Sequence, residues 1–172
     1  MSELVRILAR RRVPLGFLAT LTALVLARPS WASLQAGFAV ALLGEAIRIW
    51  AAGHLEKSRE VTRSGPYVWT RHPLYVGSSV MALGVVIASR SLIVAIVTAI
   101  YMGATLAAAI RTEEAFLRGA IGDAYDRYSD SRAEPMARRF SLERALRNRE
   151  YRAVVGLLVG FALLALKLLV LL

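Results

Sequence analysis

The sequence predicts an all-α integral membrane protein with about five transmembrane helices. Two observations indicate this class. Hydrophobic residues make up 57% of the 172 residues, whereas soluble domains contain roughly 45–50%. The apolar residues also form long blocks separated by short basic segments, although Lys and Arg outnumber Asp and Glu by 22 to 12. Apolar blocks bounded by basic residues are typical of membrane helices.

Five apolar blocks are candidate spanning helices. In chain order they cover residues 13–27, 31–52, 74–88, 92–110 and 153–172. The first block is shorter than the roughly 20 residues that a span needs, and tilt or flanking residues can make up the difference. A cleaved signal peptide is its alternative, which we disfavour because no small-residue cleavage site followed by a soluble domain appears.

Two of these blocks carry local signals of their own. The second block contains Glu45 and Arg48, three residues apart on a helix, so they can pair inside the membrane; a pair near the headgroups is the alternative. The third block follows Pro73, a residue suited to the first turn of a helix. Only Ser89-Arg90-Ser91 joins the third block to the fourth. So short a link predicts an antiparallel hairpin that returns residues 111–130 to the neighbourhood of residues 60–77.

The basic residues predict the topology. With a cytoplasmic N-terminus, 18 of the 22 basic residues lie inside and three lie outside, with Arg48 within a span. The outer three are Arg28, Arg90 and Lys167. Because cytoplasmic loops carry the excess of Lys and Arg, we expect a multi-pass protein with residues 53–72 and 111–152 in the cytoplasm. Nucleic-acid binding is the other reading of so basic a chain, and we disfavour it because membrane topology already accounts for the positions of the charges.

Composition also limits the chemistry. The chain has no cysteine and two histidines, His54 and His72. A disulfide scaffold, a thiolate metal site and a cysteine nucleophile are therefore excluded, and we expect no metal site.

A first polar and aromatic cluster precedes the third block. Gly65-Pro66 marks a turn, and Pro73 biases His72 toward an extended backbone. The aromatic residues are Tyr67, Trp69 and Tyr75. An interfacial aromatic belt would explain them without a ligand. The combination Arg71-His72-Pro73 adds a cation, a titratable ring and a rigid bend, which favours a site for a charged ligand.

A second cluster follows the fourth block. Its residues are Arg111, Thr112, Glu113, Glu114, Leu117, Gly122, Tyr125 and Tyr128. Adjacent carboxylates near a helix C-terminus are unfavourable, because that end prefers cations. A solvated helix end with Glu114 paired to Arg118 is one explanation. The other is that a carboxylate meets a positive group of a ligand.

Together the two clusters resemble the isoprenylcysteine carboxyl methyltransferase family and the related phospholipid N-methyltransferases. The first family pattern is matched by Gly65, Pro66, Tyr67, Arg71, His72, Pro73, Tyr75 and Gly77. The second, Glu-Glu followed by Leu, Gly and two tyrosines, is matched by Glu113, Glu114, Leu117, Gly122, Tyr125 and Tyr128. Before the Gly-Pro turn only Val61 and Thr62 of the family pattern are kept, and Arg111 lies closer to Glu113 than the family's arginine usually does.

The resemblance implies a methyltransferase that uses S-adenosyl-L-methionine, with the cofactor site at the cytoplasmic face. The implied cofactor-binding residues are Val61, Thr62, Gly65, Tyr67, Arg71, His72, Pro73, Leu74, Tyr75, Gly77 and Glu113. The implied catalytic residues are Glu114, as the proton acceptor if the substrate is an amine, and Arg111, on the substrate side.

We expect residues 1–172 to form one membrane-embedded domain, with a family-like core over 44–139 and an extra basic stretch and last helix over 140–172. The expected partners are the lipid bilayer and a lipophilic acceptor, either an isoprenylcysteine-type carboxylate or a lipid amine. The alternatives are a sterol-reductase-like enzyme that uses NADPH, disfavoured by Leu74 and Ser78, and a non-catalytic membrane scaffold. Oligomeric state does not follow from the sequence.

Overall fold

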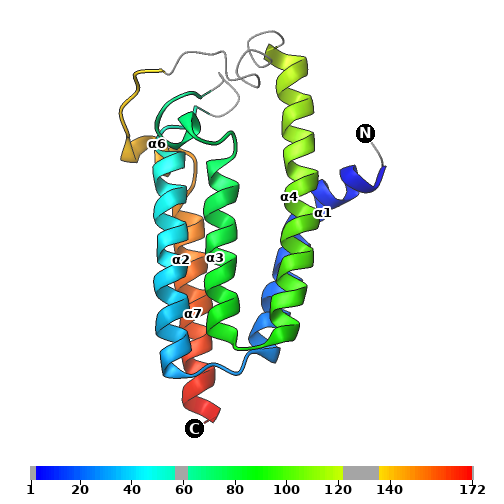
Figure 1. Cartoon of the computed structure of the whole chain (residues 1–172), viewed down its shortest axis with the longest axis vertical. Coiled ribbons are helices and arrows are strands. Elements are labelled where there is room, and N and C mark those ends of the chain that lie inside the picture. The colour runs from blue at the N-terminus through cyan, green and yellow to red at the C-terminus, as the bar shows by residue number, and fades with distance from the viewer. Residues whose placement is uncertain (1–2, 57–61, 122–135, 172) are drawn as a thin grey trace.

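The protein is a bundle of long helices, seen here in a computed structural model that describes residues 3–56, 62–121 and 136–171 (Figure 1). Its long helices are α1 (Glu3–Leu26), α2 (Trp31–Ala52), α3 (Pro73–Ser89), α4 (Leu92–Ile121) and α7 (Tyr151–Leu171). The described residues also form two short helices, the 3-10 helix η1 (Gly65–Val68) and α6 (Leu142–Arg147). The described residues contain no β-strand, which confirms the all-α prediction.

Within the part of the chain that the structure describes, three helices are long and apolar enough to cross a membrane: Trp31–Ala52, Leu92–Thr112 and Tyr151–Val170. The other two predicted spans are shorter apolar helices, Pro14–Leu26 and Pro73–Ser89. Many of the exposed side chains are large and apolar, among them Phe17, Leu92 and Val170, each at least 75% exposed. Such a surface suits contact with lipid rather than water.

The first helix changes direction within its length. Pro14 lies inside α1, and a proline in a helix interior removes a hydrogen bond and bends the axis. Figure 1 shows the N-terminal part of α1 turned away from the bundle, while the rest runs beside α4. At the other end of α1, Lys167 of α7 donates hydrogen bonds to the carbonyls of Leu24 and Val25, at 2.8 and 2.7 Å.

The seam between α2 and α3 is made of glycines. A Cβ at Gly37 would lie 2.4 Å from the carbonyl oxygen of Gly84, and one at Gly44 would lie 2.6 Å from that of Gly77. Small residues let two membrane helices approach backbone to backbone. On the opposite side α2 packs on α7, where the rings of Phe38 and Phe161 lie 5.1 Å apart.

The predicted hairpin is present. Pro73 opens α3, Arg90 closes it in the left-handed conformation with φ 48°, and α4 begins at Leu92. Helix α4 then continues to Ile121, beyond the expected apolar block that ends at Ile110. The longer helix carries the backbone of Arg111 to Leu117, the first part of the second cluster, away from the α3–α4 turn (Figure 1).

Candidate functional site

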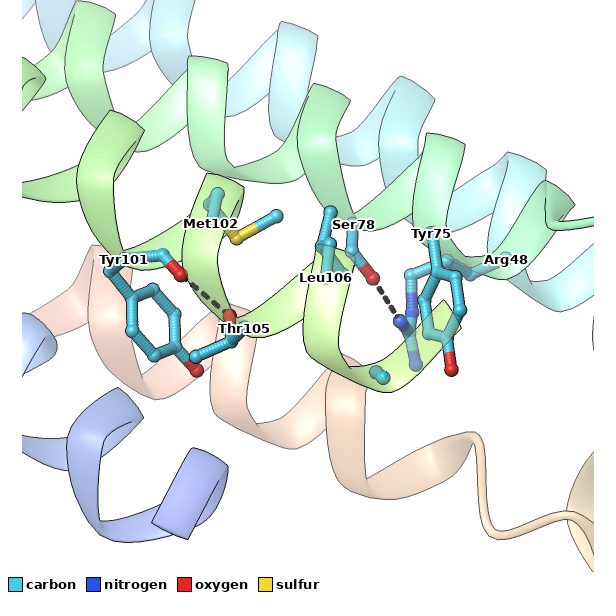
Figure 2. Close-up of a pocket in the computed structure, with 8 residues that line it drawn as sticks. Arg48, Tyr75, Ser78, Tyr101, Met102, Thr105 and Leu106 are labelled. Carbon is cyan, nitrogen blue, oxygen red and sulfur yellow. Dashed lines mark hydrogen bonds between the residues drawn. The ribbon is translucent and has the colours of Figure 1, made fainter. Parts of the chain in front are cut away.

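A pocket of about 160 Å³ lies between α2, α3 and α4 (Figure 2). Helix α3 contributes Tyr75 and Ser78, and α2 contributes Arg48. The wall from α4 consists of Tyr101, Met102, Thr105, Leu106 and Ala109. The lining therefore combines one cation and several hydroxyl groups with an apolar surface, which is the usual composition of a small-molecule site.

The guanidinium of Arg48 is the charged centre of this pocket. Its Nε donates to Oε1 of Glu150 at 2.6 Å, and its Nη1 donates to the hydroxyl of Ser78. Ser78 in turn donates to the carbonyl of Leu74 at 2.8 Å. Glu45, predicted as the partner of Arg48, lies 3.7 Å from Nε. The ion pair with Glu45 is thus present but longer than the one with Glu150.

Glu45 is 3% exposed. Neither of its carboxylate oxygens has a hydrogen-bond partner among the described residues. Burying an acid without hydrogen bonds costs free energy. The packing of the surrounding helices must therefore compensate for the burial of Glu45.

The residues that begin α3 come directly before Tyr75, its first pocket residue. The ring of His72 stacks on that of Tyr75, with centroids 5.5 Å apart and planes 24° apart. Pro73 is buried and Leu74 is half-buried, while Arg71 is exposed. A Cβ at Gly77 would lie 2.6 Å from Cγ of Arg48, so this glycine has a packing reason independent of any ligand.

The preceding turn is organised around His54, at the end of α2. Nδ1 of His54 lies 3.0 Å from the hydroxyl of Ser64. Gly65 has φ +58°, and a Cβ there would lie 2.6 Å from Cδ2 of the same ring. Burial lowers the pKa of His54, and the positive charges of Arg144 and Arg138 lower it further. Thr62 and Tyr67 are also buried in this turn.

A C-terminal segment, residues 136–150, covers the same end of α2. Arg144 pairs with Glu56 at 2.9 Å and donates to the carbonyl of Gly53, and Arg147 pairs with Glu56 at 2.7 Å. The hydrogen bond from Arg144, followed by nearby positive charge, holds the pKa of Glu56 below its usual value. Asn148 donates to the carbonyls of Ala52 and Leu55, both at 2.9 Å. These contacts satisfy carbonyls that the end of a helix leaves without partners.

The second cluster is described only in part. Arg111 is exposed and lies two residues beyond Ala109, the last pocket residue of α4. Glu113 and Glu114 belong to α4 by their backbone, but their side chains, like Val61, Gly122, Tyr125 and Tyr128, lie outside what the structure describes. The expected approach of residues 111–130 to residues 60–77 therefore stays a prediction.

Sequence reasoning missed Glu150 and the wall contributed by Tyr101 and Thr105. Thr105 donates to the carbonyl of Tyr101 at 2.6 Å, and both residues line the pocket from α4 (Figure 2). A signal existed for Glu150, because it is the acid directly before the last apolar block. Its partner Arg48 lies 102 residues earlier in the chain. No local sequence pattern predicts a pair between residues so far apart.

Comparison with known proteins gives one family and one relative. A family model described as phospholipid methyltransferase matches residues 34–124, a range that includes most of α2, all of α3, the pocket residues and Glu113-Glu114. The chain is also similar to the cobalt-zinc-cadmium resistance protein CzcN of Cupriavidus metallidurans, with 37% identity over 87 residues. That match covers 49% of this chain and 39% of the relative, so the chain spans well under two thirds of its relative's length. No solved structure matches.

Proposed function

Because the chain belongs to the phospholipid methyltransferase family, whose members are methyltransferases, we propose that it is a membrane methyltransferase using S-adenosyl-L-methionine. The methyl acceptor is a lipophilic molecule, an isoprenylcysteine-type carboxylate or a lipid amine, at the cytoplasmic boundary of the membrane. The observation that carries the proposal is the family match over residues 34–124, which includes every predicted cofactor residue from Val61 to Glu113.

The described wall of the pocket suits part of this cofactor. When bound, S-adenosyl-L-methionine supplies a methyl group on a positively charged sulfur. Its carboxylate suits the guanidinium of Arg48. Met102, Leu106 and Ala109 offer an apolar surface beside it. The donor set therefore fits a ligand that has an anionic group and a partly apolar body.

The residues around α3 would orient this ligand. Tyr75 lines the pocket and stacks on His72, so the two rings form one aromatic wall at the start of the helix. Holding two reactants in line can supply roughly 7–11 kcal/mol of a barrier. In this proposal the main task of the residues around α3 is to position the cofactor; these residues are Tyr67, Arg71, His72 and Tyr75. The lack of a side chain at Gly65 and Gly77 lets the backbone lie close to the cofactor.

The two carboxylates of α4 would have separate tasks. Neighbours on a helix point about 100° apart, so Glu113 and Glu114 cannot contact the same group. Glu113 would meet the ammonium of the cofactor. Glu114 would accept a proton from an amine acceptor, with Arg111 on the acceptor side; a carboxylate acceptor is already ionised and needs no such base.

The carboxylates provide the first test. Glu113→Gln removes a charge and keeps the shape, so it should weaken S-adenosylhomocysteine binding about ten- to a hundredfold. Glu114→Gln should leave that affinity unchanged and lower turnover of an amine acceptor. Calorimetry in detergent measures the affinity, and Glu143→Gln, an exposed carboxylate on α6, is the matched control.

The acceptor follows from a second experiment. The purified protein is incubated with labelled S-adenosylmethionine and either a prenylated cysteine or a lipid amine, and the labelled product is extracted and identified. Binding of NADPH in place of S-adenosylhomocysteine would contradict the proposed function. So would equal affinity and turnover in the Glu113→Gln variant and the parent.

A further inference from the structure

Arg48 is a long and flexible side chain in an apolar bundle, so its position in the pocket depends on what holds it. Its side chain is 21% exposed, and that of Glu150 is 8% exposed. A buried guanidinium requires a close counter-charge, because an unpaired charge in such surroundings is strongly unfavourable. The 2.6 Å contact between Nε and Oε1 of Glu150 meets this need.

Together the two hydrogen bonds of Arg48 fix the plane of its guanidinium. Glu150 holds Nε and Ser78 holds the Nη1 end. Figure 2 shows Arg48 among the pocket residues, with its bond to Ser78 drawn as a dashed line. Neither bond uses Nη2, which leaves that nitrogen for an acceptor atom of a ligand.

Glu150 is itself held by its backbone. Its N–H donates to the carbonyl of Ala145 at 3.2 Å, and Arg149 before it has φ 62°. Asn148, two residues earlier, is bonded to the end of α2. The turn before α7 is therefore anchored to the end of α2 through Asn148. This anchoring fixes the position from which the carboxylate of Glu150 contacts Arg48.

A second acid competes for Arg48. Glu45 lies 3.7 Å from Nε on the same helix, and its oxygens have no hydrogen bond among the described residues. When Glu150 is replaced by glutamine, Glu45 becomes the nearest carboxylate to the guanidinium among the described residues. Arg48 would then turn toward Glu45 and lose the arrangement shared with Ser78.

We propose that Glu150 is a positioning residue that acts through Arg48 on the pocket, so that the C-terminal segment is part of the working site although it lies beyond the family match. This inference rests on the proposed function for its effect on the ligand. Its geometric half, the placement of Arg48, can be measured without any ligand.

The placement of Arg48 is measured with a thiol at Ser78. The chain contains no cysteine, so Ser78→Cys is a single reporter beside the guanidinium. A nearby guanidinium favours the reactive thiolate. Adding Glu150→Gln should slow maleimide labelling at fixed pH about tenfold if Arg48 turns away. Unchanged or faster labelling means that Arg48 stays in place, which overturns the inference.

The effect on the pocket is measured in the same variants without the reporter. Glu150→Gln should weaken S-adenosylhomocysteine binding at least about tenfold, as for loss of a charge-assisted bond, and Glu150→Asp should restore part of it. The matched control is Glu56→Gln, which loosens the same segment through Arg144 and Arg147 but does not contact Arg48. Equal losses in Glu150→Gln and Glu56→Gln would show a merely structural role and overturn the inference.

The two proposals fail differently. If the parent does not bind S-adenosylhomocysteine while labelling slows as expected, the proposed function is wrong and the placement of Arg48 by Glu150 stands. If the parent binds and Glu150→Gln binds equally well, the positioning role is wrong and the proposed function stands.

Discussion

At the scale of single residues, His54 shows how one side chain determines the residue types around it. Its ring lies where a Cβ on Gly65 would stand, and its Nδ1 lies within hydrogen-bonding distance of Ser64. The ring also lies against Phe140 of the C-terminal segment, with centroids 6.3 Å apart. One histidine thus joins the end of α2, the turn before α3 and the C-terminal segment.

This arrangement makes stability depend on pH. The folded pKa of His54 is lowered by burial and then by Arg144 and Arg138, whereas the unfolded value is about 6.5. Below about pH 6.5 the unfolded chain takes up a proton that the folded chain resists. The free energy of unfolding therefore has its full value above about pH 6.5. It decreases as the pH falls toward the folded pKa of His54, by at most about 1.4 kcal/mol per pH unit.

Thermal unfolding in detergent at pH 7.5, 6.5 and 5.5 measures this loss. The parent should unfold at a lower temperature as the pH falls, and His54→Asn should show a flatter dependence from a lower starting stability. The same slope in both proteins would assign the effect to other groups.

At the scale of elements, the seam of α2 and α3 sets the distance between the walls of the pocket. Gly37 and Gly44 on α2 face Gly84 and Gly77 on α3, and the two glycines of each helix are spaced seven positions apart. At each of these glycines a Cβ would meet backbone atoms of the other helix, and backbone cannot move aside as a flexible side chain can. The separation of Arg48 from Tyr75 and Ser78 therefore depends on residues that carry no functional group.

Gly44→Ala tests this seam. Its Cβ would lie 2.5 Å from the backbone nitrogen of Met81, so the helices must separate, at a cost of about 1–3 kcal/mol. We expect a lower unfolding temperature in detergent. Gly156→Ala on α7 is the control, because a Cβ there meets nothing within 4 Å. Equal unfolding temperatures for Gly44→Ala and the parent would contradict the close packing.

The elements also show what the sequence could predict. The Gly65-Pro66 turn, the start of α3 at Pro73 and the hairpin at Arg90 are local features, and the structure confirms them. Contacts between distant residues were not predictable. Gly77 was expected to let backbone approach a ligand, and the structure adds Arg48 of α2 as a neighbour; the pairing of Arg48 with Glu150 depends on how α7 packs on α2.

At the scale of the whole molecule, the two ends of the bundle differ. The turn before α3, the end of α4 and the C-terminal segment lie at one end, and the α1–α2 and α3–α4 links lie at the other (Figure 1). A hydrogen bond of 2.8 Å from Arg28 N–H to the carbonyl of Ser89 joins those two links. The helix ends that the charge pattern assigns to one side of the membrane thus lie at one end of the bundle. Which end faces the cytoplasm is predicted from the charges alone.

The charge bias predicts the orientation. Basic residues are concentrated at the end that carries the pocket, so this end should be cytoplasmic and a reporter fused after Leu172 should lie outside. Reporter activity in whole cells measures this, with a fusion after Leu55 as the cytoplasmic control. A cytoplasmic signal from the fusion at Leu172 would remove either α1 or α7 from the set of spanning helices.

The late position of the C-terminal segment in the chain has a consequence for biosynthesis. The carbonyls of Ala52, Gly53 and His54 are bonded by Asn148, Arg144 and Arg138, which are 84–96 residues further along the chain. At about 5–20 residues per second, the ribosome adds these partners roughly 5–20 s after α2 has been made. During that interval α2 and α3 can pair through their glycines, and Glu45 is the acid already made that the structure shows beside Arg48. The nascent protein therefore acquires its final pocket only when the start of α7 is inserted.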